Sequence, residues 1–330
     1  MYTYSYMNVL WIKDGKKGHE KQVKVLLDEI SKSIDIKIFE ENYLINSFDR
    51  FIEIFDHATN YLMGGLRPHD LTILKYKKHN IDIVIGAGSN THTRMLLIKK
   101  ALKKDYSKNI KAISVLVPSF FQSQFDIICA PKHDSYKLSQ KRNVIFFEGS
   151  IAEVSDQVPA DNIGFMGIGG KNKHFTFDQK KLMQQIEYIL SIYSNLQWSI
   201  YPSRRTPKEM VKKLNSLKSQ YSNLKLCTHN IDETIRNATI KIVTQDSVNM
   251  VFECLSTKGQ TYLFNMKYFK KNKIVNLMNG LLESQQIGYI EYSKMADGLN
   301  KMKMANSNKH YEIFAEVEKV AYELLKKISK

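Results

Sequence analysis

The sequence predicts an α/β protein built from two Rossmann-like, parallel-sheet domains that face a cleft. Short apolar runs typical of buried strands alternate with longer amphipathic segments, which is the pattern of parallel sheets with right-handed crossovers. The alternation restarts after a polar stretch near the middle of the chain, and 330 residues suit two domains of about 150 residues each.

The first half begins with an apolar strand and a glycine-rich loop, and then keeps the strand–helix rhythm. The expected strands are 9–12, 35–39, 81–85, 113–117, 125–130 and 143–147. The expected helices are 20–32, 48–63, 68–78 and 91–104. We assign residues 1–155 to a first domain.

The stretch 155–161 is polar, contains Pro159, and is the best candidate for a linker. Beyond it we expect strands at 163–168, 198–201, 224–227, 240–244 and 260–264, and helices at 177–194, 207–220, 231–237 and 247–257. Residues 162–305 form the expected second domain. Residues 306–330 form a closing segment whose amphipathic helix is expected at 310–328.

Glycines follow expected strands in both halves, including Gly86 in the first half and Gly169 and Gly170 in the second. Open parallel sheets bind ligands beyond the carboxyl ends of their strands. Glycine allows positive φ there and lets a phosphate or sugar approach the main chain, although a simple turn accounts for such glycines as well.

Two adjacent arginines, Arg204 and Arg205, follow the second strand of the second domain, in a chain with only seven arginines. Arginine offers planar, bidentate contacts to phosphate. We expect Ser203 and both arginines to contact a diphosphate; the alternative is a surface pair that binds acidic side chains. Pro207 suits the first position of the next helix, with Thr206 as its cap.

The stretch from Asp246 to Glu253 follows another buried strand and opens a helix that Asp246 or Ser247 can cap. A helix start attracts anions through its free N–H groups and its dipole. Glu253 is a candidate for accepting the hydroxyls of a ribose, and a solvated helix carboxylate is the alternative.

The chain as a whole resembles the mitochondrial-fission (elongated-mitochondria) family, bacterial branch, and its second half looks like the donor domain of GT-B glycosyltransferases. The stretches that carry the resemblance are 11–20, 131–134, 169–175, 203–207 and 244–250. Lys171 departs from the small or proline residue that would be more familiar at its place. The resemblance implies a GT-B-like fold and a nucleoside-diphosphate sugar, such as a UDP sugar, bound through Gly169, Gly170, Lys171, the arginines and the Asp246–Glu253 stretch.

In GT-B enzymes the loop after the first strand reaches the cleft, so Asp14, His19 and Glu20 are candidates for the general base. The alternative is that His19 and Glu20 cap the helix that follows. The glycines and polar residues of the same edge are expected on the acceptor or sugar side: Gly15, Gly18, Gly86, Ser89 and Asn90.

The function expected from these features is transfer of a sugar from a nucleoside-diphosphate sugar to an envelope glycolipid or glycan. No Asp-x-Asp motif or ligand-spaced cluster suggests a metal, and we expect neither a metal nor a separate cofactor. A nucleotide-sugar epimerase or hydrolase on the same scaffold, and a non-catalytic membrane-associated adaptor, are the alternatives.

The net charge of +16 is the balance of 49 basic and 33 acidic residues. Codon bias with a solvated surface explains it, and so does attraction to an anionic membrane. No nucleic-acid motif accompanies the charge.

The apolar, lysine-bearing stretch 95–104 is either a membrane-surface helix or a helix packed on the sheet. Scattered cysteines and the lack of a signal peptide favour a cytoplasmic protein, with peripheral contact at the inner face of the membrane as a further expectation.

Overall fold

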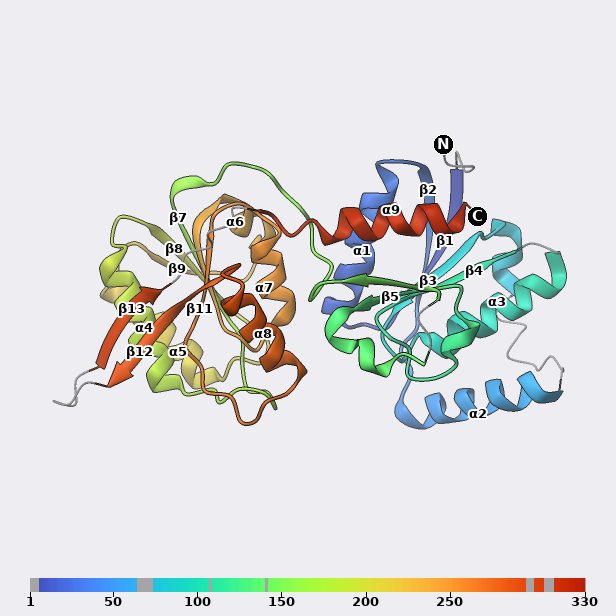
Figure 1. Cartoon of the computed structure of the whole chain (residues 1–330), viewed down its shortest axis with the longest axis horizontal. Helices are drawn as coiled ribbons and strands as arrows, with labels where there is room; N and C mark the ends of the chain where they lie inside the picture. The colour runs from blue at the N-terminus through green and yellow to red at the C-terminus, as the bar shows by residue number, and fades with distance from the viewer. Residues whose placement is uncertain are drawn as a thin grey trace. The chain divides into compact units, whose positions relative to one another are not determined.

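The computed structural model describes residues 6–63, 74–106, 109–139, 142–294, 300–305 and 312–329. The chain forms two compact units (Figure 1). Unit 1 comprises Met1–Ala152 together with Glu316–Lys330, and unit 2 comprises Glu153–Ala315.

Unit 1 is built on a parallel sheet with the strand order β2-β1-β3-β4-β5-β6. Its strands are β1 (Tyr6–Lys13), β2 (Asp35–Asn42), β3 (Ile83–Ala87), β4 (Lys111–Val115), β5 (Ile127–Pro131) and β6 (Val144–Phe147). The central strands are apolar on both faces because helices cover both sides of the sheet, so they read as continuous hydrophobic runs.

The helices of unit 1 include one from the far end of the chain. They are α1 (Lys17–Ser31), α2 (Ser47–Met63), α3 (His92–Tyr106) and α9 (Glu316–Ile328). Short 3₁₀ turns lie at Leu74–His79, Gln122–Gln124 and Lys132–Lys137. Helix α9 packs against α1 and β6, and its apolar stripe is buried there.

Unit 2 has a sheet with the order β13-β12-β11-β10-β7-β8-β9. Its strands are β7 (Ala160–Ile168), β8 (Gln197–Pro202), β9 (Leu224–Leu226), β10 (Ala238–Val243), β11 (Gln260–Leu263), β12 (Gly288–Lys294) and β13 (Asn300–Ala305). All pairs are parallel except β12 with β13, which is antiparallel at the edge. Its helices are α4 (Gln179–Ile192), α5 (Lys208–Ser216), α6 (Ile231–Asn237), α7 (Val248–Leu255) and α8 (Lys273–Glu283), with a 3₁₀ turn at Leu217–Ser219.

The strand order reverses direction once in each sheet. In unit 1 the chain moves from β1 to β2 and then returns to the other side of β1 with β3. In unit 2 it moves from β7 to β8 and β9 and then returns to the other side of β7 with β10. Such a switch point leaves a crevice beyond the carboxyl ends of the two strands that flank it, which is where open α/β sheets bind ligands.

The structure confirms the two parallel sheets and corrects several elements. The strand pair β12–β13 and helix α8 are absent from the prediction, and the closing helix begins at Glu316 rather than at residue 310. The expected helix at 68–78 lies mostly outside the described residues, and its described end is a 3₁₀ turn. Among the described helices, none combines the length and the apolar character needed to cross a bilayer.

Candidate functional site

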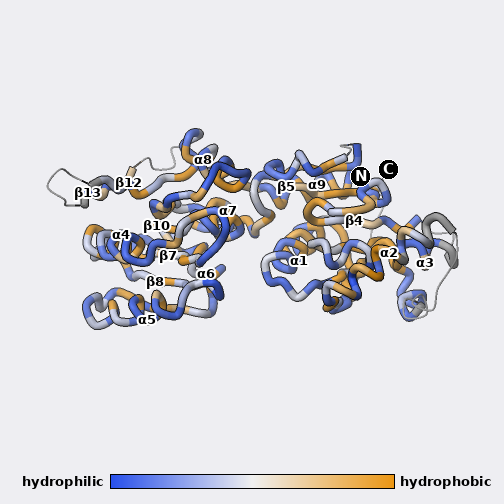
Figure 2. Tube along the Cα trace, turned by 90° about the horizontal axis from the view of Figure 1, so that it is seen from below, coloured by the Kyte–Doolittle hydropathy of each residue, from blue (hydrophilic) through white to orange (hydrophobic). Residues whose placement is uncertain are grey.

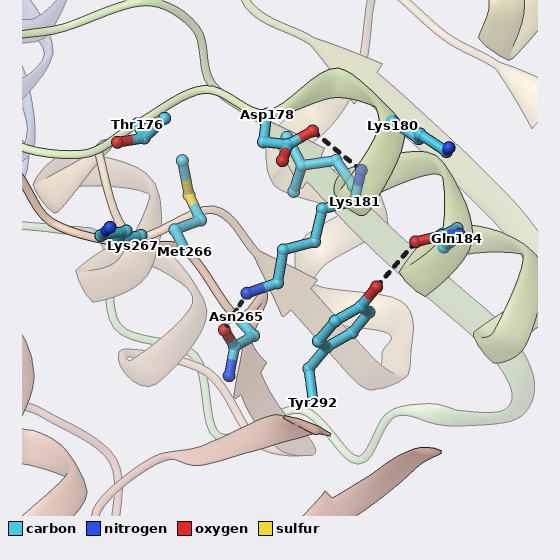
Figure 3. A pocket seen from close by; sticks show the side chains of 10 residues that line it. Thr176, Asp178, Lys180, Lys181, Gln184, Asn265, Met266, Lys267 and Tyr292 are labelled. Carbon is cyan, nitrogen blue, oxygen red and sulfur yellow. Dashed lines mark hydrogen bonds between the residues drawn. The ribbon is translucent and has the colours of Figure 1, made fainter. Parts of the chain in front are cut away.

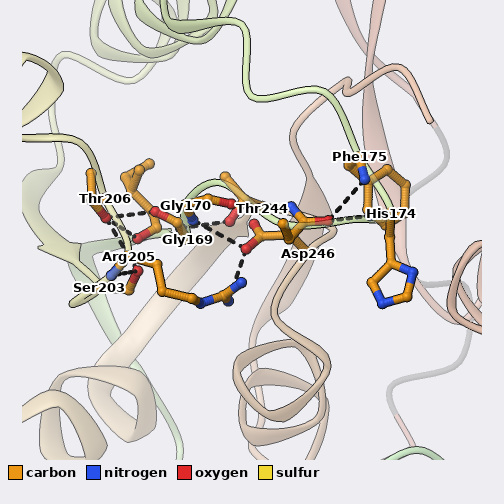
Figure 4. Close-up of polar contacts among 11 residues, drawn as sticks. Gly169, Gly170, His174, Phe175, Ser203, Arg205, Thr206, Thr244 and Asp246 are labelled. Carbon is orange, nitrogen blue, oxygen red and sulfur yellow. Dashed lines mark hydrogen bonds and ion pairs between the residues drawn. The ribbon is translucent and has the colours of Figure 1, made fainter. Parts of the chain in front are cut away.

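Three stretches that are far apart in the sequence meet at the β7/β10 switch point of unit 2 (Figure 4). The Gly169 N–H donates to the Thr244 hydroxyl at 2.7 Å, and the Gly170 N–H donates to the Asp246 carboxylate at 3.1 Å. The same carboxylate oxygen lies 2.9 Å from an Arg205 nitrogen. The loops after β7, β8 and β10 therefore form one hydrogen-bonded cluster, as their positions at strand ends predict.

Gly169 and Gly170 are required for close packing rather than for an unusual backbone conformation. Neither is among the glycines with positive φ in the described chain, so the predicted use of positive φ is wrong for this loop. A Cβ on Gly169 would lie 2.1 Å from the Asp246 carboxylate, and a Cβ on Gly170 would lie 2.0 Å from the Arg205 carbonyl oxygen. Any side chain here would push the neighbouring loops apart.

Ser203 and Thr206 shape the arginine loop. The Thr206 hydroxyl lies 3.0 Å from the Ile168 carbonyl oxygen and 2.5 Å from that of Gly169. Helix α5 starts at Lys208, with Pro207 at the N-cap position and no side-chain cap. The prediction that Thr206 caps this helix is therefore wrong, because its hydroxyl ties the loop to the end of β7 instead.

The two adjacent arginines have different environments. Arg205 is paired with Asp246, whose side chain is fully buried. Arg204 is exposed, and among the described residues it forms no hydrogen bond or ion pair. Arg205 therefore holds the loop together, while Arg204 presents an uncommitted guanidinium at the carboxyl edge of the sheet.

Helix α7 starts at Val248 directly after this cluster. Ser247 occupies the N-cap position, but its side chain makes no capping hydrogen bond, and the Asp246 carboxylate faces Gly170 and Arg205. The expected side-chain cap is thus not observed. Glu253 lies in the second turn of α7 and is partly exposed, and Lys171 is exposed on the loop after β7.

The surroundings of this cluster are basic. Burial lowers the pKa of His174, and the positive charges of Lys173, Lys273 and Arg205 lower it further, against a hydrogen bond with Asn272 that raises it. His174 is held in place through its backbone N–H, which donates to Asn172 at 2.6 Å. The accumulation of positive charge favours an anionic ligand. The prediction omits His174 from the site, because a lone histidine in a loop gives no spacing signal.

Unit 1 has its own polar cluster at the β1/β3 switch point. The Asp14 side chain is fully buried, and one of its oxygens lies 2.9 Å from His19 Nδ1 and 3.6 Å from the Lys16 ammonium. Burial raises the pKa of Asp14, but the hydrogen bond and charge of His19 and the contacts with Lys16 outweigh it and hold this pKa below 3.8. With Nδ1–H donating to a carboxylate, the neutral imidazole of His19 has Nε2 as an acceptor.

The loop after β3 approaches this pair closely. Gly88 has φ of +86°, and a Cβ on it would lie 2.3 Å from His19 Nδ1. Gly15 also has positive φ, and a Cβ there would meet the Leu44 side chain at 2.8 Å. Here glycine is needed both for the conformation and for the space.

The remaining candidates of unit 1 have structural partners or flank the cluster. Glu20 accepts a hydrogen bond from the Gly15 N–H at 2.8 Å, so it fixes the loop. Gly18 lies in the first turn of α1, Gly86 lies near the end of β3, and Ser89 and Asn90 are partly exposed ahead of α3. Of the three predicted bases, only His19 combines a polar partner with partial exposure and a free ring nitrogen in that tautomer.

Unit 2 also contains a cavity of about 720 Å³ that no sequence motif indicates (Figure 3). It lies between the start of α4 and the segment after β11, and its lining includes Lys180, Lys181 and Lys267. Lys181 donates to Asn265 at 2.6 Å and lies over the ring of Tyr292. Its residues come from elements too distant in sequence for a motif to reveal.

Within the described part of the chain, no group of three or more His, Cys, Asp and Glu side chains is placed to hold a metal ion. Cys129 and Cys254 are buried free thiols, and Cys227 is partly exposed.

Comparisons with solved structures find similar folds at low sequence identity. A Listeria monocytogenes protein provisionally named UDP-N-acetylglucosamine 2-epimerase is 12% identical, with 98% of this chain and 96% of that one covered and a TM-score of 0.53. The Escherichia coli ADP-heptose lipopolysaccharide heptosyltransferase II is 8% identical, with 98% of each chain covered and a TM-score of 0.48. A comparison with curated proteins finds no match.

The strand orders and the Listeria structure together confirm the GT-B-like α/β fold class. The family model of mitochondrial fission ELM1 matches residues 17–328, which is nearly the whole chain. The resemblance seen in the sequence is thereby confirmed, and the chain belongs to the mitochondrial fission ELM1 family.

Proposed function

We propose that this protein binds a nucleoside-diphosphate sugar in unit 2 and transfers its sugar to a hydroxyl acceptor of an envelope glycolipid or glycan, without a metal ion. The observation that carries the proposal is the β7/β10 switch point, where the uncommitted Arg204 and the start of α7 lie at one edge of the sheet. A diphosphate is the ligand whose charge and size suit a guanidinium beside a helix N-terminus.

In this proposal the donor contacts are divided among the residues of unit 2. Arg204 and the first amides of α7 neutralise the leaving diphosphate, while Arg205 and Asp246 keep the loops in register. Gly169, Gly170 and Ser203 shape the backbone, and the exposed Lys171 adds positive charge around it. Glu253 is proposed as the acceptor for the ribose hydroxyls.

The transfer itself requires a base that removes the proton of the acceptor hydroxyl. We assign this role to His19 Nε2, with Asp14 holding the ring and stabilising the imidazolium that forms. The acceptor oxygen bonds to the anomeric carbon, the bond to the diphosphate oxygen breaks, and the negative charge is left on the diphosphate.

A nucleotide-sugar epimerase or hydrolase is the second candidate, favoured by the name of the Listeria structure. An epimerase or hydrolase would use the same donor site without a glycolipid or glycan acceptor. The two functions therefore differ in whether turnover of the nucleotide sugar requires an acceptor.

The test is to follow nucleoside-diphosphate release from a panel of nucleotide sugars, with and without a glycolipid extract. We expect release that depends on the extract and falls at least about a hundredfold in His19→Asn. Release at the same rate without any acceptor would favour the second candidate, and no release from any donor in either condition would contradict both.

A further inference from the structure

The polar side of helix α2 faces the rest of unit 1. His57 is buried, and its Nε2 lies 2.8 Å from Gln124 Oε1. Glu53 accepts a hydrogen bond from the Tyr43 hydroxyl, and the Nε atom of Arg50 is buried. The residues at helical spacing that would be expected to face water therefore face the body of the unit.

The opposite side of α2 is apolar and faces solvent. Phe48, Phe51 and Phe55 are 72%, 67% and 60% exposed, and Ile52 between them is 41% exposed. We call these four residues the α2 outer face. Their spacing of i, i+3, i+4 and i+7 is the apolar stripe of an amphipathic helix, here directed outward. The helix is prominent in hydrophobic colour in Figure 2.

A continuous apolar stripe of this kind marks a surface that another molecule covers. Single exposed apolar residues need no partner. Three phenylalanines in line expose enough apolar surface that removing it from water would be clearly favourable. The polar inner side of α2 is attached to the rest of unit 1, because Glu53 is hydrogen-bonded to Tyr43 and His57 to Gln124.

The width of the stripe argues against a second copy of the chain as the occupant. Helix α2 has 17 residues, so it is about 25 Å long, and one face about 10 Å wide offers roughly 250 Å². Stable protein interfaces use about 800 Å² per partner. A lipid surface has no such minimum, because an interfacial helix binds by burying its apolar face a few ångströms deep.

Charge around α2 favours an anionic lipid surface. Leu44, just before α2, is 76% exposed and would be touched by a Cβ on Gly15, and the exposed Lys16 and Lys17 follow Gly15 directly. These lysines belong to a chain with a net charge of +16. Each lysine near an anionic bilayer adds to the attraction.

We propose that the α2 outer face docks into the interfacial region of an anionic lipid bilayer. The proposal goes beyond the sugar transfer and does not depend on it, since docking needs neither donor nor acceptor. Because Leu44 contacts the Gly15 loop, docking would bring lipid head groups close to Asp14 and His19 within the same unit.

The membrane surface expected at residues 95–104 is different from this one. Met95, Ile98 and Leu102 of α3 are buried in the core of unit 1, and Lys99 is paired with Asp126 at 2.6 Å. Of the two alternatives for residues 95–104, the structure therefore supports a helix packed on the sheet.

The test is sedimentation of the full chain with vesicles made of equal parts phosphatidylcholine and phosphatidylglycerol. We expect the wild type to bind and the triple variant Phe48→Ser, Phe51→Ser and Phe55→Ser to bind about tenfold less or weaker still. The matched control removes three exposed apolar side chains elsewhere and should bind as the wild type does: Val158→Ser, Phe269→Ser and Tyr322→Ser.

A fluorescence measurement locates the contact. The two native tryptophans, Trp11 and Trp198, are buried, so a new exposed tryptophan can be followed. In Phe51→Trp the emission should shift to shorter wavelength when vesicles are added, and in Phe269→Trp it should not. Equal sedimentation of wild type and triple variant, or no shift in Phe51→Trp, overturns the proposal. So does a dimer in solution that the triple variant abolishes, which would assign the α2 outer face to a second copy.

Discussion

We expect the adjacent residues Arg204 and Arg205 to contribute differently to the free energy of unfolding. Arg205→Ala leaves the buried Asp246 carboxylate without its ion pair, which should lower the free energy of unfolding by about 2 kcal/mol. Arg204→Ala removes an exposed side chain and should change it by less than about 0.5 kcal/mol. Urea unfolding of both variants measures the difference, and equal losses would contradict the assigned division of roles.

The acid–base pair of unit 1 supports a second prediction. Asp14→Asn keeps the shape of the side chain but removes the carboxylate that fixes His19, so sugar transfer should fall about a hundredfold or more. Glu20→Gln is the matched control, because its remaining amide oxygen can still accept from the Gly15 N–H, and it should retain most of the activity. The measurement is the initial rate of sugar transfer with one donor and a glycolipid extract. A larger loss in Glu20→Gln than in Asp14→Asn would contradict the assignment of His19.

At the scale of residues, the sequence identified most members of the two clusters but not their partners. Strand-end position was enough to select Gly169, Arg205 and Asp246. That Asp246 would pair with Arg205 rather than cap α7 depends on how closely the loops approach, which no local pattern reveals. The predicted φ of Gly169 was wrong for the same reason.

At the scale of elements, β10 and α7 are joined by a buried lysine. The Lys241 ammonium contacts the Cys254, Thr257 and Lys258 carbonyl oxygens at 2.6, 3.0 and 2.8 Å, and the Thr257 hydroxyl at 2.7 Å. The first of these oxygens lies in the last turn of α7, where a positive charge is favourable. Lys241 thus fixes the end of the helix whose start lies at the proposed donor site.

Lys241→Met should therefore destabilise unit 2 by about 3 kcal/mol, because several buried carbonyl oxygens lose their donor.

Burial lowers the pKa of Lys241 from 10.5 to about 8. Between these pH values the unfolded chain binds more protons at this residue than the folded one, so its contribution to stability rises with pH and declines as the pH falls through about 8. Urea unfolding across this range should give a steeper rise for the wild type than for Lys241→Met. The exposed Lys225→Met serves as the control, and an unchanged pH slope in Lys241→Met would contradict the account.

The sequence predicted the regular strands and helices better than the irregular end of unit 2. Strands such as β3 and β10 are buried on both faces and show as apolar runs. The edge pair β12–β13 alternates apolar and polar residues with lysines between them, and α8 follows a lysine-rich loop, so neither gives a comparable signal. The outward direction of α2 was equally hidden, since periodicity reveals an apolar face but not the side to which it turns.

At the scale of the whole molecule, the last helix belongs to the first unit. The side chains of α9 that pack on unit 1 are buried, among them Val320, Leu324 and Ile328. Ending the chain after Ala315 should therefore leave unit 1 without part of its core, and it should lose its cooperative unfolding transition while unit 2 keeps its own. Calorimetry of the shortened chain checks this, with the full chain as the reference. Two intact transitions in the shortened chain would show that α9 is dispensable.

Both units place a polar cluster at the point where the strand order of the sheet reverses. The sequence predicted parallel sheets from the alternation of elements, and it placed glycines and charged residues at strand ends. It did not give the order of the strands, because crossover direction depends on packing between elements rather than on any single segment. The order is what brings the β7 and β10 loops together, and the β1 and β3 loops likewise.

We propose that unit 2 binds a nucleoside diphosphate through Arg204. The most direct measurement is a thermal-shift titration of nucleoside diphosphates with the wild type, Arg204→Ala and Arg204→Lys. At a ligand concentration about a hundredfold above the dissociation constant, binding stabilises the fold by about 2.7 kcal/mol. We predict a clear rise in melting temperature for at least one diphosphate with the wild type, a reduced rise with Arg204→Lys, and none with Arg204→Ala at the same concentration. No rise with any diphosphate, or an equal rise with Arg204→Ala, would contradict the claim.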